Sequence, residues 1–416
     1  MGRPFWTVWS AGAVSYAGDG LVAGAMPVVA ASLTRDPRQV ALVEVFETGG
    51  WLLVGLVSGV VADRVNRLAL MWRVDILRAA LLFAYAVVVL RVGSSIALLC
   101  ALGLLLGLAA PFHDNAASSV VPELVEDRQL ERANSLNQIS ILVAAMLVGP
   151  TLGAVWAAQS LTAPFVADAA TFLVGAVLIW WAAGRLHGGP DQAKPAPHET
   201  AVTAVTTTLW SALRSGLAYL WGHPTLRVLA AAVAVVNGVS GAVTSILVLY
   251  VTGDLGLPES TYGLAMALFA VGGVVGAVCT RAISARLTAR ATVTLAMVAF
   301  SVAALVLGLA PTAALAALAL VLAGFGSFTW NVVTVTYRQR IVPRPLLGRV
   351  TSAYRMVAFI AMPAGAAAAG LLAHALGSIP VVYALGGVVL LLTTALCWPL
   401  LSGLTGDLAA ATRHTD

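Results

Sequence analysis

Ionisable side chains placed inside apolar stretches are the residues of this sequence that could do chemistry. Asp19 lies in the middle of the first apolar stretch, between Gly18 and Gly20, whose small size leaves room for a ligand or water. His113 and Asp114 lie together in the fourth apolar stretch. Burial favours the neutral form of an acid, and imidazole titrates near neutral pH. Asp19, His113 and Asp114 are therefore candidates for taking up and releasing protons.

Each of these acids also has a structural interpretation. Asp19 could be tied permanently to a neighbouring helix, and His113 or Asp114 could form a structural hydrogen bond. Glu44 and Glu47 stand three residues apart on one face of the second stretch. They could draw cations or protons to the outer mouth of a pathway, or they could be solvated residues near a helix end. Asp168, in the sixth stretch, is expected to be structural.

Composition indicates what kind of chain positions these residues. Of the 416 residues, 60% are hydrophobic and 10% are charged, and the mean hydropathy is +0.93. A soluble surface needs roughly 25–35% charged residues, so the sequence predicts an all-α integral membrane protein. The net charge of +5 comes from basic residues in short loops beside apolar stretches, so no nucleic-acid partner is expected. Cys100, Cys279 and Cys397 lie in apolar stretches, which excludes a thiolate metal site.

The apolar stretches are long enough to cross a bilayer, which takes about 20 residues of helix. They predict twelve transmembrane helices in two pseudo-symmetric six-helix bundles. The spans of the first bundle cover 5–33, 40–62, 74–92, 95–119, 133–156 and 161–184, and those of the second cover 225–251, 261–281, 291–310, 313–337, 347–373 and 378–402. The predicted bundles are residues 1–184 and 213–402, joined by a cytoplasmic linker at 185–212 and followed by a cytoplasmic tail at 403–416.

Basic residues alternate between loops as the positive-inside rule requires. With the N-terminus in the cytoplasm, only Arg35, Arg38 and Arg91 fall outside, while all other basic residues, Arg78 and Arg338 included, are assigned to the inside. This bias predicts a multi-pass protein of the cytoplasmic (inner) membrane of a bacterium, with both termini in the cytoplasm.

A weak internal repeat supports two parallel halves. The segment from Pro122 to Ser135 has a counterpart from Gln339 to Ser352, roughly 215 residues later. Both segments join the fourth span of their half to the fifth, as expected of parallel repeats in transporters. The alternative is that two short cytoplasmic loops share Arg, Pro and Gly without common descent.

The loop after the second span contains Gly59, Asp63, Arg64 and Arg67. Their spacing resembles a signature of the major facilitator superfamily, although the usual further basic residue is replaced by Leu68. The resemblance implies a conformational gate at these four residues that does not contact the substrate. Asp63 would act as a cytoplasmic latch by pairing with a basic group or with a helix N-terminus.

Further short motifs resemble the drug and siderophore exporter branch of this superfamily, which includes the enterobactin exporter and macrolide efflux proteins. Gly149, Pro150 and Gly153 resemble the helix-five motif of its proton-coupled exporters, with Ala154 in place of the last glycine. A Gly-Pro pair permits a kink in a membrane helix, and plain helix packing is the alternative. Other matching phrases are Val74–Ala79, Pro122–Val125, Arg132–Leu136, Gly216–Leu220 and Gly348–Val350.

In this superfamily spans one, four, seven and ten line the pathway. The resemblance therefore adds substrate-cavity candidates in spans seven and ten, for which interhelical hydrogen bonding is the alternative. With the two acids of span two, the candidates are Glu44, Glu47, Asn237, Trp330, Asn331 and Tyr337. The arginine that span four often carries is missing here, so His113 could take its role.

The function implied is a secondary active transporter that exports a small amphiphilic organic compound, such as a drug, an antibiotic or a siderophore, in exchange for protons. It would work by alternating access, as a monomer in the lipid bilayer. The sequence has no phosphate-binding loop and no His-Glu-x-x-His or Cys/His cluster, so no enzyme activity, cofactor or metal is expected. A proton-coupled uptake symporter on the same fold and a non-transporting membrane sensor are the alternatives.

Overall fold

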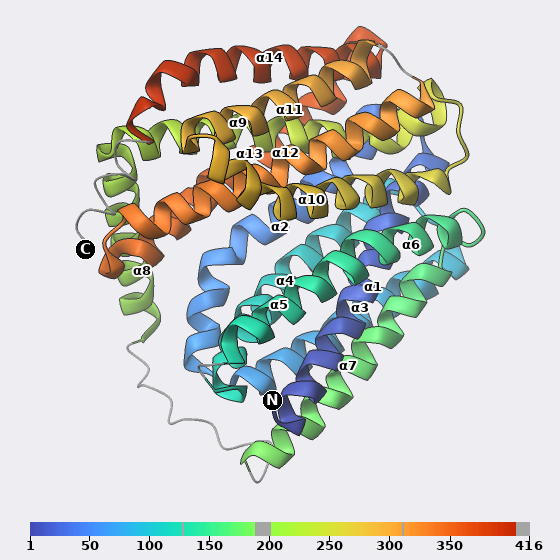
Figure 1. Cartoon of the computed structure of the whole chain (residues 1–416). Coiled ribbons are helices and arrows are strands. Elements are labelled where there is room, and N and C mark those ends of the chain that lie inside the picture. The colour runs from blue at the N-terminus through green and yellow to red at the C-terminus, as the bar shows by residue number, and fades with distance from the viewer. Residues whose placement is uncertain (127–128, 188–200, 310–311, 405–416) are drawn as a thin grey trace. The chain divides into compact units, whose positions relative to one another are not determined.

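The computed structural model describes residues 1–126, 129–187, 201–309 and 312–404, and these residues contain helices but no strand (Figure 1). The helices of the first half are α1 (Arg3–Leu33), α2 (Pro37–Arg64), α3 (Arg67–Val92), α4 (Ile96–Leu124), α5 (Leu130–Ser140), the π-helix η2 (Ile141–Val148), α6 (Gly149–Ala157) and α7 (Ala163–His187). Those of the second half are α8 (Ala201–Gly222), α9 (Pro224–Leu249), the π-helix η3 (Tyr250–Asp254), α10 (Thr261–Arg286), α11 (Ala289–Leu309), α12 (Ala313–Ile341), α13 (Arg344–Leu376) and α14 (Ile379–Leu400).

These elements confirm the all-α membrane fold. Apart from α8 they make twelve membrane-length segments, because α5, η2 and α6 run on as one and α9 continues into η3. Ten of the described helices are long and apolar enough to cross a membrane. Large apolar side chains such as Leu53, Val177 and Leu396 face outward, as expected where lipid replaces water.

Helix α3 begins earlier than the prediction of residue 74. Asn66 caps its N-terminus, with the side chain accepting a hydrogen bond from the Ala69 amide. The polar run that separates the second span from the third therefore ends at Arg67, and Asp75 and Arg78 lie well inside the helix. Arg78, counted with the inside basic residues, therefore lies within α3 and not in a loop.

The described residues form two compact units. Unit 1 comprises those of Met1–Arg35, Phe46–Val202 and Pro258–Ala267, and unit 2 comprises those of Asp36–Val45, Thr203–Leu257 and Leu268–Asp416. The units depart from the two halves of the chain at α2 and α10, because the first turns of each belong to the unit of the other half. The bundle boundaries at 184 and 213 remain a prediction.

Unit 1 is held together by close glycine contacts between α1 and α6. A Cβ atom on Gly24 would lie 2.2 Å from the Pro150 carbonyl oxygen, and one on Gly153 would lie 2.0 Å from that of Leu21. Gly20 and Gly149 face each other, so that a Cβ atom on either glycine would meet the Cα atom of the other. Small residues four apart on both helices let the backbones touch, as in other membrane helix pairs.

Unit 2 repeats this packing. A Cβ atom on Gly365 of α13 would lie 1.8 Å from the Gly238 carbonyl oxygen of α9, and one on Gly241 would lie 2.3 Å from that of Met362. The fifth span of each half thus packs against the first span of the same half. In the same way α7 packs against α3, and α14 packs against α11. The pairing supports the predicted pseudo-symmetry.

The helix-five motif coincides with a change of helix type. Pro150 has no N–H to donate, and the Gly149 amide donates to the Ala144 carbonyl, five residues back. The turns just before the proline are therefore wound as the π-helix η2. The expected local distortion at Gly149 and Pro150 takes this form.

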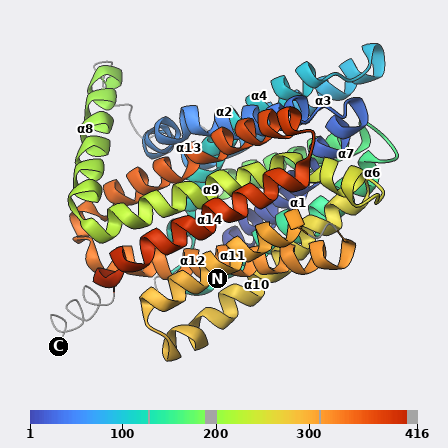
Figure 2. The ribbon, with the colours of Figure 1, turned by 90° about the horizontal axis from the view of Figure 1, so that it is seen from above.

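The predicted linker lies only partly within the described structure. Its residues 188–200 lie outside the described residues, α7 continues to His187, and α8 begins at Ala201. Helix α8 runs crosswise to α9 within unit 2 (Figure 2). It is anchored there by the buried side chains of Leu213 and Leu220. Of the predicted tail, residues 405–416 lie outside the described residues.

Candidate functional site

The charged side chains of unit 1 meet around Asp19 of α1. Arg78 of α3 forms an ion pair and a hydrogen bond with the Asp19 carboxylate through Nη2. The guanidinium carbon of Arg78 lies 4.0 Å from the ring centroid of Phe172 on α7, and Arg78 is only 5% exposed. Arg78 is therefore enclosed between an acid and an aromatic ring, an arrangement that stabilises a desolvated cation.

Asp168 of α7 fills the room beside Asp19. A Cβ atom on Gly18 would lie 1.9 Å from the Oδ1 atom of Asp168, and Thr171 donates a hydrogen bond of 2.9 Å to that oxygen. On the other side, the backbone of α6 and η2 occupies the space beside Gly20. The space that Gly18 and Gly20 were expected to leave for ligand or water is thus occupied by the protein itself.

Asp75 and His113 form a second, fully enclosed group. Asp75 of α3 is 0% exposed, and its carboxylate oxygens have no hydrogen-bond partner among the described residues. The Nε2 atom of His113, on α4, lies 3.5 Å from Asp75 Oδ1. The Nδ1 atom of the same ring lies 3.8 Å from Oδ1 of Asp114, whose side chain is partly exposed. His113 thus stands between a buried acid and an accessible one.

We call these residues the acid cluster, and its charges do not balance. Four carboxylates face one guanidinium and one imidazole; the members are Asp19, Asp75, Arg78, His113, Asp114 and Asp168. Like charges repel more strongly in a poorly solvated interior than in water, so the excess of carboxylates over cations is unfavourable when all four are ionised. A carboxyl group that takes up a proton would reduce this excess of negative charge.

The predicted gate residues lie where α2, α3 and α4 meet. Arg67 donates a hydrogen bond of 3.2 Å to the Ser119 carbonyl and forms an ion pair with Glu123 of α4. Gly59 faces the Asn115 side chain, and Arg64 is the last residue of α2. The Asp63 side chain lies outside the described residues. Arg67 therefore ties the start of α3 to the end of α4 within unit 1.

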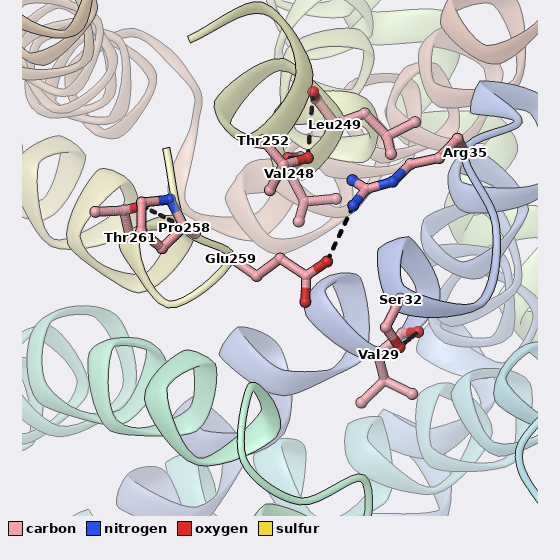
Figure 3. Close-up of polar contacts among 9 residues, drawn as sticks. All are labelled: Val29, Ser32, Arg35, Val248, Leu249, Thr252, Pro258, Glu259 and Thr261. Carbon is pink, nitrogen blue, oxygen red and sulfur yellow. Dashed lines mark hydrogen bonds and ion pairs between the residues drawn. The ribbon is translucent and has the colours of Figure 1, made fainter. Parts of the chain in front are cut away.

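A second ion pair of unit 1 involves a residue from the second half of the chain. The Nη2 atom of Arg35, just after α1, lies 3.3 Å from Oε1 of Glu259, just before α10 (Figure 3). Close by, the Thr151 hydroxyl of α6 lies 3.3 Å from the Gly263 carbonyl of α10. The first turns of α10 are thus held by α1 and α6.

The matching segment of unit 2 is the start of α2. Gly370 of α13 packs on the backbone of Pro37 and Arg38, where a Cβ atom would meet them at 3.0 Å. Asp36 accepts hydrogen bonds from Arg38, which hold the pKa of its carboxyl below the ordinary value, and it lies 3.6 Å from Nδ1 of His374. These contacts tie the first turns of α2 to the end of α13.

Glu44 and Glu47 belong to different units, although they share one helix. Glu44 belongs to unit 2 with the start of α2, and Glu47 belongs to unit 1. The Cβ atom of Glu47 lies 3.4 Å from the position that a Cβ on Gly103 would take, and the Glu47 carbonyl lies against Gly107. Glu47 is therefore packed on α4.

The cavity candidates of unit 2 do not share one environment. Asn237 of α9 donates a hydrogen bond of 2.9 Å to the Ala358 carbonyl of α13. Trp330 and Tyr337 of α12 are buried in the apolar core of unit 2, whereas Asn331 is exposed. Beside them, Arg338 is buried with its guanidinium carbon 3.8 Å from the ring centroid of Tyr354.

A family model described as "Transmembrane secretion effector" matches residues 2–406. The chain belongs to this family of the major facilitator superfamily. The transporter is 27% identical over 383 residues to "Multidrug efflux pump Tap" of Mycolicibacterium fortuitum, a match that covers 87% of each chain.

Solved structures share the transporter's fold. A bacterial homologue of the iron transporter ferroportin in an inward-facing state has a TM-score of 0.75 and 17% identity, covering 96% of this chain and 99% of that one. A mutant of the peptide transporter POT has a TM-score of 0.78 and 13% identity, covering 98% and 96%. At these identities the similarity shows the fold alone, and it confirms the major facilitator fold. The protein spans the membrane several times and is a transporter of small-molecule substrates, not an enzyme.

The sequence identified only part of the transporter's acid cluster. Asp19, His113 and Asp114 were proton-coupling candidates, and the structure brings them together with Asp75 and Arg78. The latter two were missed because they lie at the very start of the predicted third span, 74–92, where Arg78 was counted with the inside basic residues. Their spacing of three residues is a usable signal, because it places an acid and a base on one face of a helix. Asp168, predicted to be structural, lies in the same cluster.

Proposed function

We propose that this transporter is a proton-coupled exporter of a small amphiphilic organic compound, such as a drug, an antibiotic or a siderophore. It works by alternating access as a monomer, in the cytoplasmic membrane of a bacterium, with both termini in the cytoplasm. The observation that carries the proposal is the Asp19–Arg78 ion pair inside a cluster with more acids than bases. The kinship with Multidrug efflux pump Tap favours export over uptake.

Protonation of Asp19 provides the coupling step. Arg78 is held by the Asp19 carboxylate, and it also feels the charges of Asp168, Asp114 and Asp75. When Asp19 takes up a proton its attraction for Arg78 is lost, and Arg78 can turn toward another carboxylate of the cluster. Two arrangements of the same side chains, selected by a proton, are the kind of bistable element that can drive a population shift.

The cargo enters the cycle through the same charge balance. The ionised Asp19 carboxylate can attract a cationic group of the cargo, and the protonated carboxyl leaves Arg78 available to a polar group of the cargo. The proton and the cargo then bind in turn, which couples the two flows. Asp19 is the proposed switch, while His113 and Asp114 provide a route for the proton between the enclosed Asp75 and the accessible side of the cluster.

The test is accumulation of a panel of fluorescent amphiphilic dyes in an efflux-deficient bacterial host. Cells with the wild-type transporter should accumulate less dye, and an uncoupler or Asp19→Asn should restore accumulation. Asp254→Asn is the matched control, because it makes the same change on an exposed aspartate outside the acid cluster. Full efflux by Asp19→Asn would refute the coupling role, and increased accumulation with the wild type would show uptake.

Reconstitution separates coupling from transport. Proteoliposomes that contain a pH-sensitive dye should report proton movement when an exported dye is added on the side from which it is taken. Asp19→Asn should bind the dye without moving protons. Dye transport at the wild-type rate in the absence of any pH gradient or proton movement would contradict the proposal.

A further inference from the structure

Arg338 of α12 is a buried cation with no acidic partner among the residues that the structure describes. It lies in the last turn of α12, where it is 5% exposed, and its Nη1 atom has no hydrogen-bond partner among the described residues. The Tyr354 ring stacks on its guanidinium but offers only a partial negative face. An ionised group held away from water needs an opposite charge to compensate its lost hydration.

Within residues 203–404, the second half of the chain places no acid beside Arg338. Between residues 203 and 404 the sequence contains two acids, Asp254 and Glu259. Glu259 is paired with Arg35 in unit 1. Asp254 ends the helix that begins with Pro224, whereas Tyr354 beside Arg338 reaches the Leu229 carbonyl near the start of that helix. At 1.5 Å per residue, Leu229 and Asp254 are about 37 Å apart.

Further hydrogen-bond donors stand beside Arg338. Trp330 is 6% exposed, and its indole Nε1 also has no hydrogen-bond partner in the described part of the chain. Residues 330, 334 and 338 lie on one face of α12, and the Tyr354 hydroxyl of α13 lies beside all three side chains. Guanidinium and indole groups only donate, and the acceptor beside them is the neutral Tyr354 hydroxyl, so no anionic acceptor faces them among the described residues.

We propose that Arg338, Trp330 and Tyr354 form an anion-binding subsite for the carboxylate or phosphate group of a small amphiphilic molecule. The guanidinium supplies the charge and the fork of donors that suits both groups, and the indole adds a third donor. The aromatic walls and the apolar core of unit 2 around them favour an organic molecule over a free inorganic ion. The inference rests on the proposed function only in naming that molecule as cargo.

Binding to the purified full-length transporter in a neutral detergent tests the subsite. The probes are 2-naphthoate, 2-naphthyl phosphate, neutral 2-naphthamide and cationic 2-naphthylmethylammonium, each titrated by calorimetry. We expect the two anions to bind at least tenfold more tightly than the amide and the cation. Equal affinity for all four probes would overturn the proposal.

Variants on one helix assign the binding to Arg338. Arg338→Gln should weaken naphthoate binding at least tenfold and leave amide binding unchanged, while Arg338→Lys should restore part of the loss. Arg340→Gln, which removes an exposed arginine two residues away, should bind naphthoate within twofold of wild type. Trp330→Phe keeps an aromatic ring but removes the indole N–H, and it should weaken naphthoate binding by a smaller factor than Arg338→Gln. Equal losses in Arg338→Gln and Arg340→Gln would refute the subsite.

Folding and lipids give two further discriminating outcomes. Arg338→Gln removes a charge that has no acidic partner, so it should elute as a folded monodisperse protein. Aggregation of Arg338→Gln alongside folded Arg340→Gln would show that Arg338 has a structural partner and would overturn the proposal. In nanodiscs, phosphatidylglycerol should not weaken naphthoate binding relative to phosphatidylcholine. Displacement by phosphatidylglycerol would assign the subsite to a lipid headgroup and overturn its assignment to cargo.

The experiment is independent of transport. Loss of dye efflux together with intact, Arg338-dependent naphthoate binding would sink the proposed function and leave the subsite standing. Proton-coupled efflux with no preference for anionic probes would support the proposed function and overturn the subsite.

Discussion

Arg78 and Arg338 are equally buried arginines that face opposite electrostatic problems. Each stacks on an aromatic ring, Phe172 for the first and Tyr354 for the second. Arg78 is surrounded by carboxylates of unit 1, whereas Arg338 has no acid within the described part of unit 2 that could reach it. The charge of Arg78 is compensated by carboxylates of the protein, whereas the charge of Arg338 is, in our proposal, compensated by an anionic group of a bound molecule.

This difference reflects the distribution of acids along the chain. Fourteen of the 18 acidic residues lie in the first 200 positions, while the basic residues are shared almost evenly between the halves. Two halves with the same helix packing therefore carry different chemistry. The helix packing is the same in both halves because small residues make the helix contacts. The charged residues do not make these contacts, so they can differ between the halves.

The largest effect is expected from breaking the buried pair. Arg78→Gln leaves Asp19 and its neighbouring acids without their cation. Removing one partner of a fully buried pair costs about 3–5 kcal/mol, and because the Asp19 side chain is 32% exposed we expect a loss near the low end of that range. Efflux should be abolished, and thermal unfolding in detergent should occur at a lower temperature. Arg73→Gln, on an exposed arginine of the same helix, is the control and should unfold like wild type. Equal stability of the two variants would mean that the pair is not buried in solution.

The next effect tests whether the two halves pack alike. Gly24→Ala and Gly241→Ala each force a Cβ atom to about the same distance from a carbonyl oxygen, 2.2 Å from Pro150 and 2.3 Å from Met362. Overpacking of this kind costs about 1–3 kcal/mol, and the two variants should lose similar stability. Gly49→Ala, where nothing lies within 4 Å, should be neutral. A large loss in one half only would break the structural equivalence.

A smaller effect is expected from Arg338→Gln on stability. Because the guanidinium has no acid to leave behind, its removal should change the free energy of unfolding by less than about 1 kcal/mol, or raise it. The contrast with Arg78→Gln in the same unfolding assay measures how differently the two arginines are compensated. A loss as large as that of Arg78→Gln would contradict the account of unit 2.

The smallest effect belongs to an arginine that has an acid but no burial. Arg38, exposed in the first turn of α2, donates to Asp36 just before the helix and lowers the pKa of that carboxyl from the ordinary 3.8. A depressed pKa in the folded state gives stability that is present above pH 3.8 and is lost as the pH falls through the lowered value. Arg38→Gln should make the stability lost on acidification smaller, because the pKa of Asp36 moves back toward its ordinary value. The unfolding temperature should then depend slightly less on pH below pH 4. A steeper pH dependence in Arg38→Gln would contradict the prediction that Arg38 lowers the pKa of Asp36.

The fold could be predicted from the sequence more fully than the site. Apolar runs of membrane length and the arginine bias between loops identify the spans, because both follow from the bilayer. Asp19 stands out because an acid flanked by glycines interrupts such a run. Arg78 and Arg338 do not stand out, because arginines near predicted span ends look like loop charges. Only the structure shows that α3 begins at Arg67 and that the last turn of α12 is enclosed by α13.

The glycine contact between α1 and α6 also bears on how this transporter can evolve. Every substitution at Gly24 or Gly153 adds at least a Cβ atom where a carbonyl already stands. Asp19 is one residue from Gly20 in the same contact, so the helix that carries it tolerates little drift. New cargo ranges are therefore expected to arise from changes in unit 2 or on the accessible side of α4, while the neighbourhood of Asp19 stays fixed across descendants.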